Sequence, residues 1–134
     1  MIEQAFLDRW SPRLLSLLRL VAGLLYVEHG TAKLLHFPYA EYLVLKDPLL
    51  SLSGIAGFFD GIGGCLLILG LFTRPVALLL SGEMAVAYFL VKAPHGFFPI
   101  LNGGELPALY SFLYLYLSAA GGGAWSLDRW IRRV

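Results

Sequence analysis

The stretch LLYVEHGTAKLLHF, residues 24–37, is mostly apolar yet carries Glu28, His29 and Lys33 in its middle. Ionisable side chains are costly to bury in apolar surroundings unless they are paired or hydrogen-bonded. The stretch belongs to a longer apolar run over residues 14–35, and about 20 such residues make a helix that crosses the hydrocarbon core of a membrane. We therefore predict a first membrane helix whose ionisable groups find partners on other helices.

The composition of the whole chain also indicates a membrane protein. Hydrophobic residues make up 58% of the 134 residues and charged residues only 14%, against roughly 45–50% and about 25% in average usage. The mean hydropathy is +0.73. The net charge of +1 provides no overall field that would attract nucleic acid. We predict the lipid bilayer as the main partner and no nucleic-acid binding.

Three further apolar runs have similar lengths: residues 53–71, 76–93 and 105–124. Residues that break helices separate the four runs: Pro38 and Pro48, residues 73–75, and residues 94–104. Proline has no backbone N–H to continue a helix, and glycine weakens one. The predicted fold is therefore all-α: an integral membrane four-helix bundle, multi-pass, formed by a single domain over residues 1–134.

Both ends of the chain have the pattern of short segments at the membrane interface. Apolar residues share one helical face at each end: Ile2, Phe6 and Trp10 at the start, and Leu127, Trp130, Ile131 and Val134 at the end. Trp and Arg beside a membrane helix favour the headgroup region. We predict an interfacial segment at each terminus.

The distribution of Lys and Arg predicts the orientation in the membrane. Six lie near the termini or the second connection: Arg9, Arg13, Arg74, Arg129, Arg132 and Arg133. Three lie near the opposite helix ends: Lys33, Lys46 and Lys92. Because cytoplasmic loops carry the excess of Lys and Arg, both termini are predicted to be cytoplasmic.

Several ionisable or polar residues are predicted to meet in the outer half of the bundle. The candidates for ligand binding or proton handling are Glu28, His29, Lys33, Asp60 and Glu105, with Glu83, His95 and Asn102 as secondary candidates. Intramembrane ionisable residues usually face the bundle interior or a wet cavity. Lys33 is the cation placed to neutralise the acids, with Asp60 and Glu105 as its expected partners. We expect one carboxyl to stay protonated, and such a group can exchange a proton.

Two interpretations of these residues stay open at this point: polar pairs that only fix the helix packing, and a site for a small molecule or redox partner. Glu83 is expected to stand apart from the outer group and to hydrogen-bond within the bundle as a neutral acid. Gly57 and Gly61 form a small-xxx-small pair that would draw the second helix against a neighbour and turn Asp60 inward. A glycine-rich face also suits a second copy of the chain in a homo-oligomer.

The single cysteine, Cys65, excludes an intramolecular disulfide, a CxxC pair and a multi-cysteine metal site. We expect Cys65 to be a small buried residue. His29 and His36 are seven residues apart, and no haem, flavin or iron–sulfur ligand set is evident. No metal site is predicted and no cofactor is evident, while a quinone is a candidate ligand of the polar group.

The motifs, taken in order, resemble those of the DoxX family of small bacterial membrane proteins with four helices. LRLVAGLLYVEHGTAKL carries the pattern Arg-x-x-x-Gly followed by His-Gly-x-x-Lys-Leu, and DGIGGCLLILGLFTR is similar to the second-helix motif. Asp60 stands where the family more often has Glu. HGFF from His95, NGGE from Asn102 and GGGAWSLD near the end complete the resemblance, which covers residues 18–128.

The resemblance implies a place in the bacterial cytoplasmic (inner) membrane and a link to sulfur or quinone redox metabolism and oxidative stress. We therefore predict a subunit or accessory of a membrane oxidoreductase system, with an outer-facing polar cavity but without redox cofactor ligands of its own. Whether the chain is itself an enzyme stays open. The alternatives are a carrier or transporter of a small molecule, and a membrane scaffold that recruits soluble redox proteins.

Overall fold

The computed structural model describes residues 1–42 and 50–132. Lys46 and Pro48 of the first predicted connection, and Arg133 and Val134 of the C-terminal segment, lie outside the described residues. The described part of the chain is helical and contains no β-strand. The all-α prediction is confirmed.

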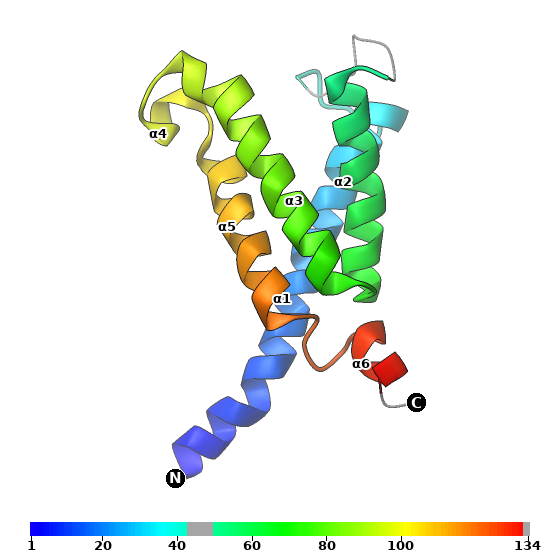
Figure 1. The fold of residues 1–134 in the computed structure, drawn as a ribbon, viewed down its shortest axis with the longest axis vertical. Helices are drawn as coiled ribbons and strands as arrows, with labels where there is room; N and C mark the ends of the chain where they lie inside the picture. The colour runs from blue at the N-terminus through cyan, green and yellow to red at the C-terminus, as the bar shows by residue number, and fades with distance from the viewer. Residues whose placement is uncertain (43–49, 133–134) are drawn as a thin grey trace.

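Four long helices form the body of the molecule (Figure 1): α1 (Ile2–Leu35), α2 (Leu52–Leu69), α3 (Thr73–Ala87) and α5 (Glu105–Ala120). The shorter elements are the π-helical turn η1 (Tyr88–Lys92), the 3-10 turn η2 (Ala93–His95), α4 (Pro99–Asn102) and α6 (Leu127–Arg132). Helix α1 contacts α2, α2 contacts α3, and α3 contacts α5.

Among the described residues, three helical segments are long and apolar enough to cross a membrane: Ile2–Leu35, Leu52–Leu69 and Thr73–His95. Helix α5 has 16 residues and is therefore about 24 Å long, which is shorter than the hydrocarbon core of about 30 Å. Large apolar side chains such as Phe58, Ile62 and Leu79 are exposed on the outer faces of the helices. Exposed apolar faces of this extent require lipid, so the chain is a membrane protein.

Helix α1 begins at Ile2 rather than near residue 14, so the predicted N-terminal segment is continuous with the first helix. Pro12 lies inside α1 and removes only one intrahelical donor. The Pro12 carbonyl accepts hydrogen bonds from the Ser16 hydroxyl at 3.1 Å and from the Ala124 amide at 3.0 Å. These contacts join the helix at Pro12 to the C-terminal segment.

The N-terminus lies at one end of the molecule, together with the α2–α3 turn and α6 (Figure 1). We call this the terminal end. The C-terminal end of α1, the start of α2 and the region from η1 to α4 lie at the other end. The described Lys and Arg residues that predicted the orientation fall at these two ends as the prediction grouped them. The arginines belong to elements of the terminal end, and Lys33 and Lys92 belong to elements of the other end.

Glycine residues bring α1 and α2 into close contact. A Cβ atom added at Gly30 would lie 2.5 Å from the Gly61 nitrogen and 2.9 Å from the Gly57 oxygen, and one at Gly23 would lie 2.9 Å from the Gly64 oxygen. Only glycine allows backbones to approach this closely. The predicted close contact at the Gly57–Gly61 pair is present, and Gly30 of α1 is the residue that packs against it.

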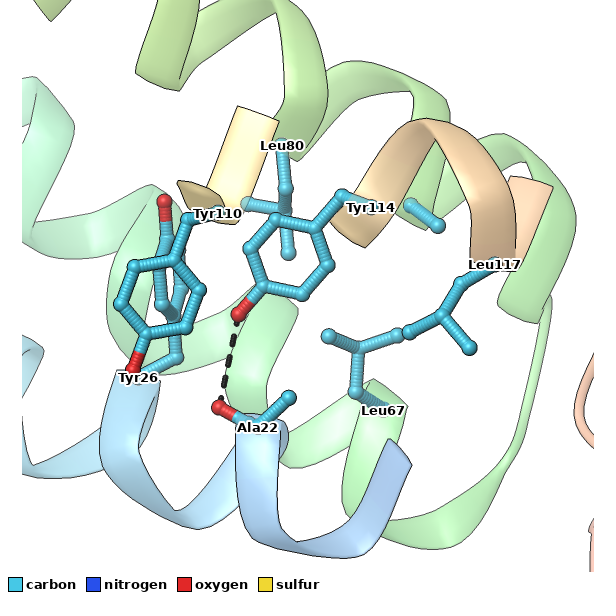
Figure 2. Close-up of a cluster of buried hydrophobic side chains, with 8 residues drawn as sticks. Ala22, Tyr26, Leu67, Leu80, Tyr110, Tyr114 and Leu117 are labelled. Carbon is cyan, nitrogen blue, oxygen red and sulfur yellow. Dashed lines mark hydrogen bonds between the residues drawn. The ribbon is translucent and has the colours of Figure 1, made fainter. Parts of the chain in front are cut away.

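The interior combines apolar, aromatic and polar side chains. Tyr26 of α1 packs edge-on against Tyr110 and Tyr114 of α5, with ring centroids 5.5 Å and 5.0 Å apart (Figure 2). Between α3 and α5, the hydroxyls of Ser81 and Ser111 each donate to the other's backbone carbonyl, at 2.7 Å and 3.0 Å. Such small polar contacts join helices that the hydrophobic effect cannot drive together in lipid.

The C-terminal segment ties α1 to the α2–α3 turn. Asp128 accepts hydrogen bonds from the backbone amides of Phe72 at 2.8 Å and Thr73 at 2.9 Å, and its own amide donates to the Gly70 carbonyl at 2.9 Å. Arg19, fully buried in α1, donates to the Trp125 carbonyl at 2.6 Å. The Ser-Leu-Asp motif therefore caps the start of α3.

Asp128→Ala is expected to lower the free energy of unfolding by about 1 to 2 kcal/mol at neutral pH, because the cap of α3 is lost. Burial raises the pKa of the Asp128 carboxyl, but hydrogen bonds from Thr73 and Phe72 and the charge of Arg132 outweigh it and hold the pKa below its usual value. This stabilisation is complete above the unfolded-state pKa of about 3.9 and is lost as the pH falls through the lower folded-state pKa. In thermal unfolding, the gap between wild type and variant should stay constant near neutrality and shrink in acid. A stability difference between wild type and variant that does not change with pH would contradict the prediction.

Candidate functional site

The centre of the candidate site is an ion pair between α1 and α2. Lys33 Nζ lies 2.6 Å from Asp60 Oδ2, and the side chains of Lys33 and Asp60 are 15% and 2% exposed. The close approach of Gly30 to Gly57 and Gly61 brings α1 near enough for the lysine, one turn further along, to reach the acid. Asp60 is thus buried and paired with Lys33, as expected, but its second oxygen, Oδ1, has no hydrogen-bond partner.

Glu83 of α3 joins this pair, so the expectation that it stands apart is wrong. The Glu83 carboxyl is buried and lies within hydrogen-bonding reach of the Asp60 carboxyl, with the Lys33 charge nearby. Neither Glu83 oxygen has any other hydrogen-bond partner among the described residues. Asp60 lies eleven residues before Leu71 in the α2–α3 turn and Glu83 twelve residues after it. At about 1.5 Å per residue, an antiparallel pair of helices places the two acids at nearly the same depth. Counting from the turn, rather than from the predicted membrane faces, would have found this contact.

Tyr26 completes the group of buried polar residues. It is 2% exposed, its hydroxyl has no hydrogen-bond partner, and it lies within electrostatic reach of Asp60 and Glu83. The neighbouring Tyr114 is different, since its hydroxyl donates to the Ala22 carbonyl at 3.4 Å (Figure 2). We call Tyr26, Lys33, Asp60 and Glu83 the central cluster.

The chemistry of the central cluster follows from its donors and acceptors. Lys33 is ion-paired with Asp60 and lies within electrostatic reach of Glu83, and the Asp60 and Glu83 carboxyls can hydrogen-bond to each other only if one carries a proton. The free Tyr26 hydroxyl can donate to a carboxylate or to a bound molecule after a small rotation. Buried groups that are only partly satisfied are costly to a fold, which makes this cluster a candidate for proton exchange or ligand binding.

The other three primary candidates lie outside the central cluster. Glu28 and Glu105 are exposed, and the described residues contain no ion pair that involves either acid. Glu105 is therefore not a partner of Lys33, because it opens α5 at the surface. His29 is half-buried, with Nδ1 2.8 Å from the Leu25 carbonyl and its ring centroid 6.5 Å from that of Tyr26.

The secondary candidates in the third connection have local contacts. His95 is exposed, with Nδ1 2.9 Å from the Val91 carbonyl. Asn102 is buried, and its amide donates to the Gly96 carbonyl at 2.9 Å while its oxygen accepts from the Gly104 amide at 2.7 Å. These hydrogen bonds close the turn around α4, and they leave Asn102 engaged with its own connection.

Cys65 is exposed, so the expectation of a buried thiol is wrong. The residue shares a helical stripe with Phe58, Ile62 and Leu69, which are exposed apolar residues of α2, whereas the glycines on another face pack against α1. Helical spacing from the exposed aromatic residues, rather than the general habit of cysteine, indicates this position. Across the part of the chain that the structure describes, no group of three or more His, Cys, Asp and Glu residues is arranged to hold a metal ion.

Comparison with known proteins finds relatives of similar sequence. A protein of Haemophilus influenzae described as an uncharacterized protein is 47% identical over 128 residues, which cover 91% of this chain and 93% of the relative. A second uncharacterized protein of the same organism is 39% identical over 69 residues, covering 52% of this chain and 46% of the relative. No solved structure matches.

A match to a family model identifies the family of the chain. The family model described as DoxX matches residues 14–93, which include Lys33, Asp60 and Glu83 of the central cluster. The matched region is more than half of the chain and contains the first two motifs of the resemblance, in the predicted order. The chain therefore belongs to the DoxX family.

Proposed function

We propose that this DoxX protein is a subunit or accessory of a membrane oxidoreductase system acting on quinones or sulfur compounds, and that its central cluster exchanges a proton with a quinone-like molecule. The observation that carries the proposal is the burial of two carboxyls, Asp60 and Glu83, around the single amine of Lys33. Reduction of a quinone carbonyl takes up protons, and a positioned acid supplies them efficiently.

The surroundings of the cluster support an apolar ring or tail nearby. A groove of 270 Å³ between α2 and α3 is lined almost wholly by apolar side chains: Phe58, Phe59, Ile62, Gly63, Leu66, Val76, Leu79 and Leu80. Phe59 and Gly63 flank Asp60 on α2, and the buried Leu80 stands between the groove and the interior. We propose that a quinone ring enters from this lipid-facing groove and meets the cluster when Leu80 changes rotamer.

The same proposal includes the finer architecture. The four long helices act as a four-helix bundle in the bacterial inner membrane, with the terminal end in the cytoplasm. Support comes from the common location of the N-terminus, the α2–α3 turn and α6 (Figure 1) and from the arginines near that end, which follow the rule that cytoplasmic ends are positive. The central cluster then lies nearer the outer face.

The test is binding of decylubiquinone to the full chain in nanodiscs, followed by calorimetry in two buffers with different ionisation enthalpies. We expect the wild type to bind the quinone with a change in bound protons. Asp60→Asn and Glu83→Gln should each weaken binding by about tenfold or more and change the proton count, since a hydrogen bond to a charged group is lost. Glu28→Gln, which removes an exposed acid from α1, is the matched control and should bind like the wild type.

Binding that survives both substitutions would show that the central cluster is not the site. A wild type that binds no quinone would refute the quinone role. Passage of a small molecule across vesicles without a redox change would instead support the carrier alternative. These outcomes separate the site assignment from the choice of function.

A further inference from the structure

A second candidate site lies at the terminal end, away from the central cluster. A cleft of 570 Å³ opens between the start of α3, the glycine segment 121–123, α6 and one turn of α1. We call it the basic cleft, because its lining contains Arg74, Arg129 and Arg132 against one acid, Asp128. Its net positive charge favours an anionic ligand.

The four charged residues of the basic cleft are held differently. Arg74 Nη1 donates to the Ala119 carbonyl at 2.5 Å and the Ser118 carbonyl at 3.5 Å, so its guanidinium is fixed at the end of α5. Asp128 already accepts two backbone hydrogen bonds at the start of α3. Arg129 and Arg132 are exposed on α6 and form no ion pair within the described residues. The two α6 arginines are therefore available to an anion.

Further donors lie in and behind the wall of the cleft. Thr73 lines the cleft and is 0% exposed, and its side chain lies within hydrogen-bonding reach of the Asp128 carboxyl. Behind the wall, the fully buried Arg19 leaves Nε and Nη1 unpartnered and lies against Gly70 and Ser126. A group of guanidiniums suits a phosphate, which accepts hydrogen bonds on several oxygens.

The basic cleft continues into an apolar groove along α1. This groove, of 840 Å³, is lined by Phe6, Leu7, Trp10, Ser11, Leu14, Leu15, Leu18 and Tyr116. Ser11 and Leu15 line both the groove and the cleft. From Phe6 to Leu18 the helix rises about 18 Å, so the surface offers a long apolar track that begins beside the arginines.

We propose that the basic cleft and the α1 groove together bind one acidic phospholipid. The phosphate lies against Arg74, Arg129 and Arg132, and an acyl chain follows the groove toward Leu18. A soluble phosphate would explain the basic cleft but not the apolar groove beside it. The shared wall at Ser11 and Leu15 favours a ligand that is charged at one end and apolar along its length.

The test is native mass spectrometry of the full chain in detergent, titrated with phosphatidylglycerol or with phosphatidylcholine carrying the same acyl chains. We expect tighter binding of phosphatidylglycerol. The double variant R129Q/R132Q should lose about fivefold in affinity for each arginine removed. Arg9→Gln removes an exposed arginine of the same end that lines neither surface, and should leave binding unchanged.

Equal binding of the two lipids, or an equal loss in Arg9→Gln and in the double variant, would overturn the proposal. A third arm adds inorganic phosphate, or glycerol phosphate without acyl chains, as competitor. Displacement of the lipid at equal concentrations would assign the cleft to a soluble anion and would also overturn it. Leu15→Gln, at the junction of the two surfaces, should weaken the lipid but leave any binding of glycerol phosphate unaffected.

Discussion

Lys33→Ala is expected to lower the free energy of unfolding by about 3 to 5 kcal/mol, because removing one partner of a buried ion pair leaves the other charge uncompensated. Asp60 is 2% exposed and lies 2.6 Å from the amine, and Glu83 adds a second carboxyl beside it. The loss should appear in unfolding of the purified protein by SDS or heat in detergent, followed by circular dichroism.

Two variants test whether the loss comes from the pair itself. Arg9→Ala removes an exposed cation from the same helix and should change stability by less than about 0.5 kcal/mol. The double variant K33M/D60L replaces the pair with apolar side chains and should recover much of the lost stability. Equal losses for Lys33→Ala and Arg9→Ala would show that the pair contributes nothing to the fold.

Gly30→Ala is expected to separate α1 from α2 and to cost about 1 to 3 kcal/mol or more, as overpacking of a tight contact does. Its Cβ would lie 2.5 Å from the nitrogen and 2.7 Å from the Cα of Gly61, and 2.9 Å from the Gly57 oxygen. All three are backbone atoms, so no side-chain rotation relieves the clash. Because Lys33 is three residues further along α1, the variant should also weaken its pairing with Asp60. The same unfolding measurement applies.

Gly61→Ala is the matched control on the opposite side of the same contact. A Cβ added at Gly61 meets no atom within 4 Å, and alanine is a better helix former than glycine by about 1 kcal/mol. This variant should therefore be neutral or stabilising. If alanine were tolerated equally at both glycines, the close contact of α1 with α2 would be disproved.

Different parts of the site were predictable to different degrees. Lys33 and Asp60 could be found because strong charges in apolar runs need partners, and the glycines beside Asp60 indicated that its helix would meet another one closely. Glu83 could not be placed by its distance from a predicted membrane face, because the ends of apolar runs are uncertain by several residues. Glu28 and Glu105 met the same criterion as Asp60, but each lies on a helix face that the packing leaves exposed.

The amino-acid sequence by itself determined the all-helical membrane character, the DoxX membership and the need of Lys33 for an acidic partner, because length, hydropathy and motif order are properties of the linear chain. Only the tertiary structure decided that Glu83 and Tyr26 join the pair, that Cys65 faces outward and that Ser126 to Asp128 return to cap α3. These contacts depend on helix rotation and depth. Helix rotation and depth are set by the packing of glycines on one helix against the backbone of the next. The residue pattern of a single helix does not specify that contact.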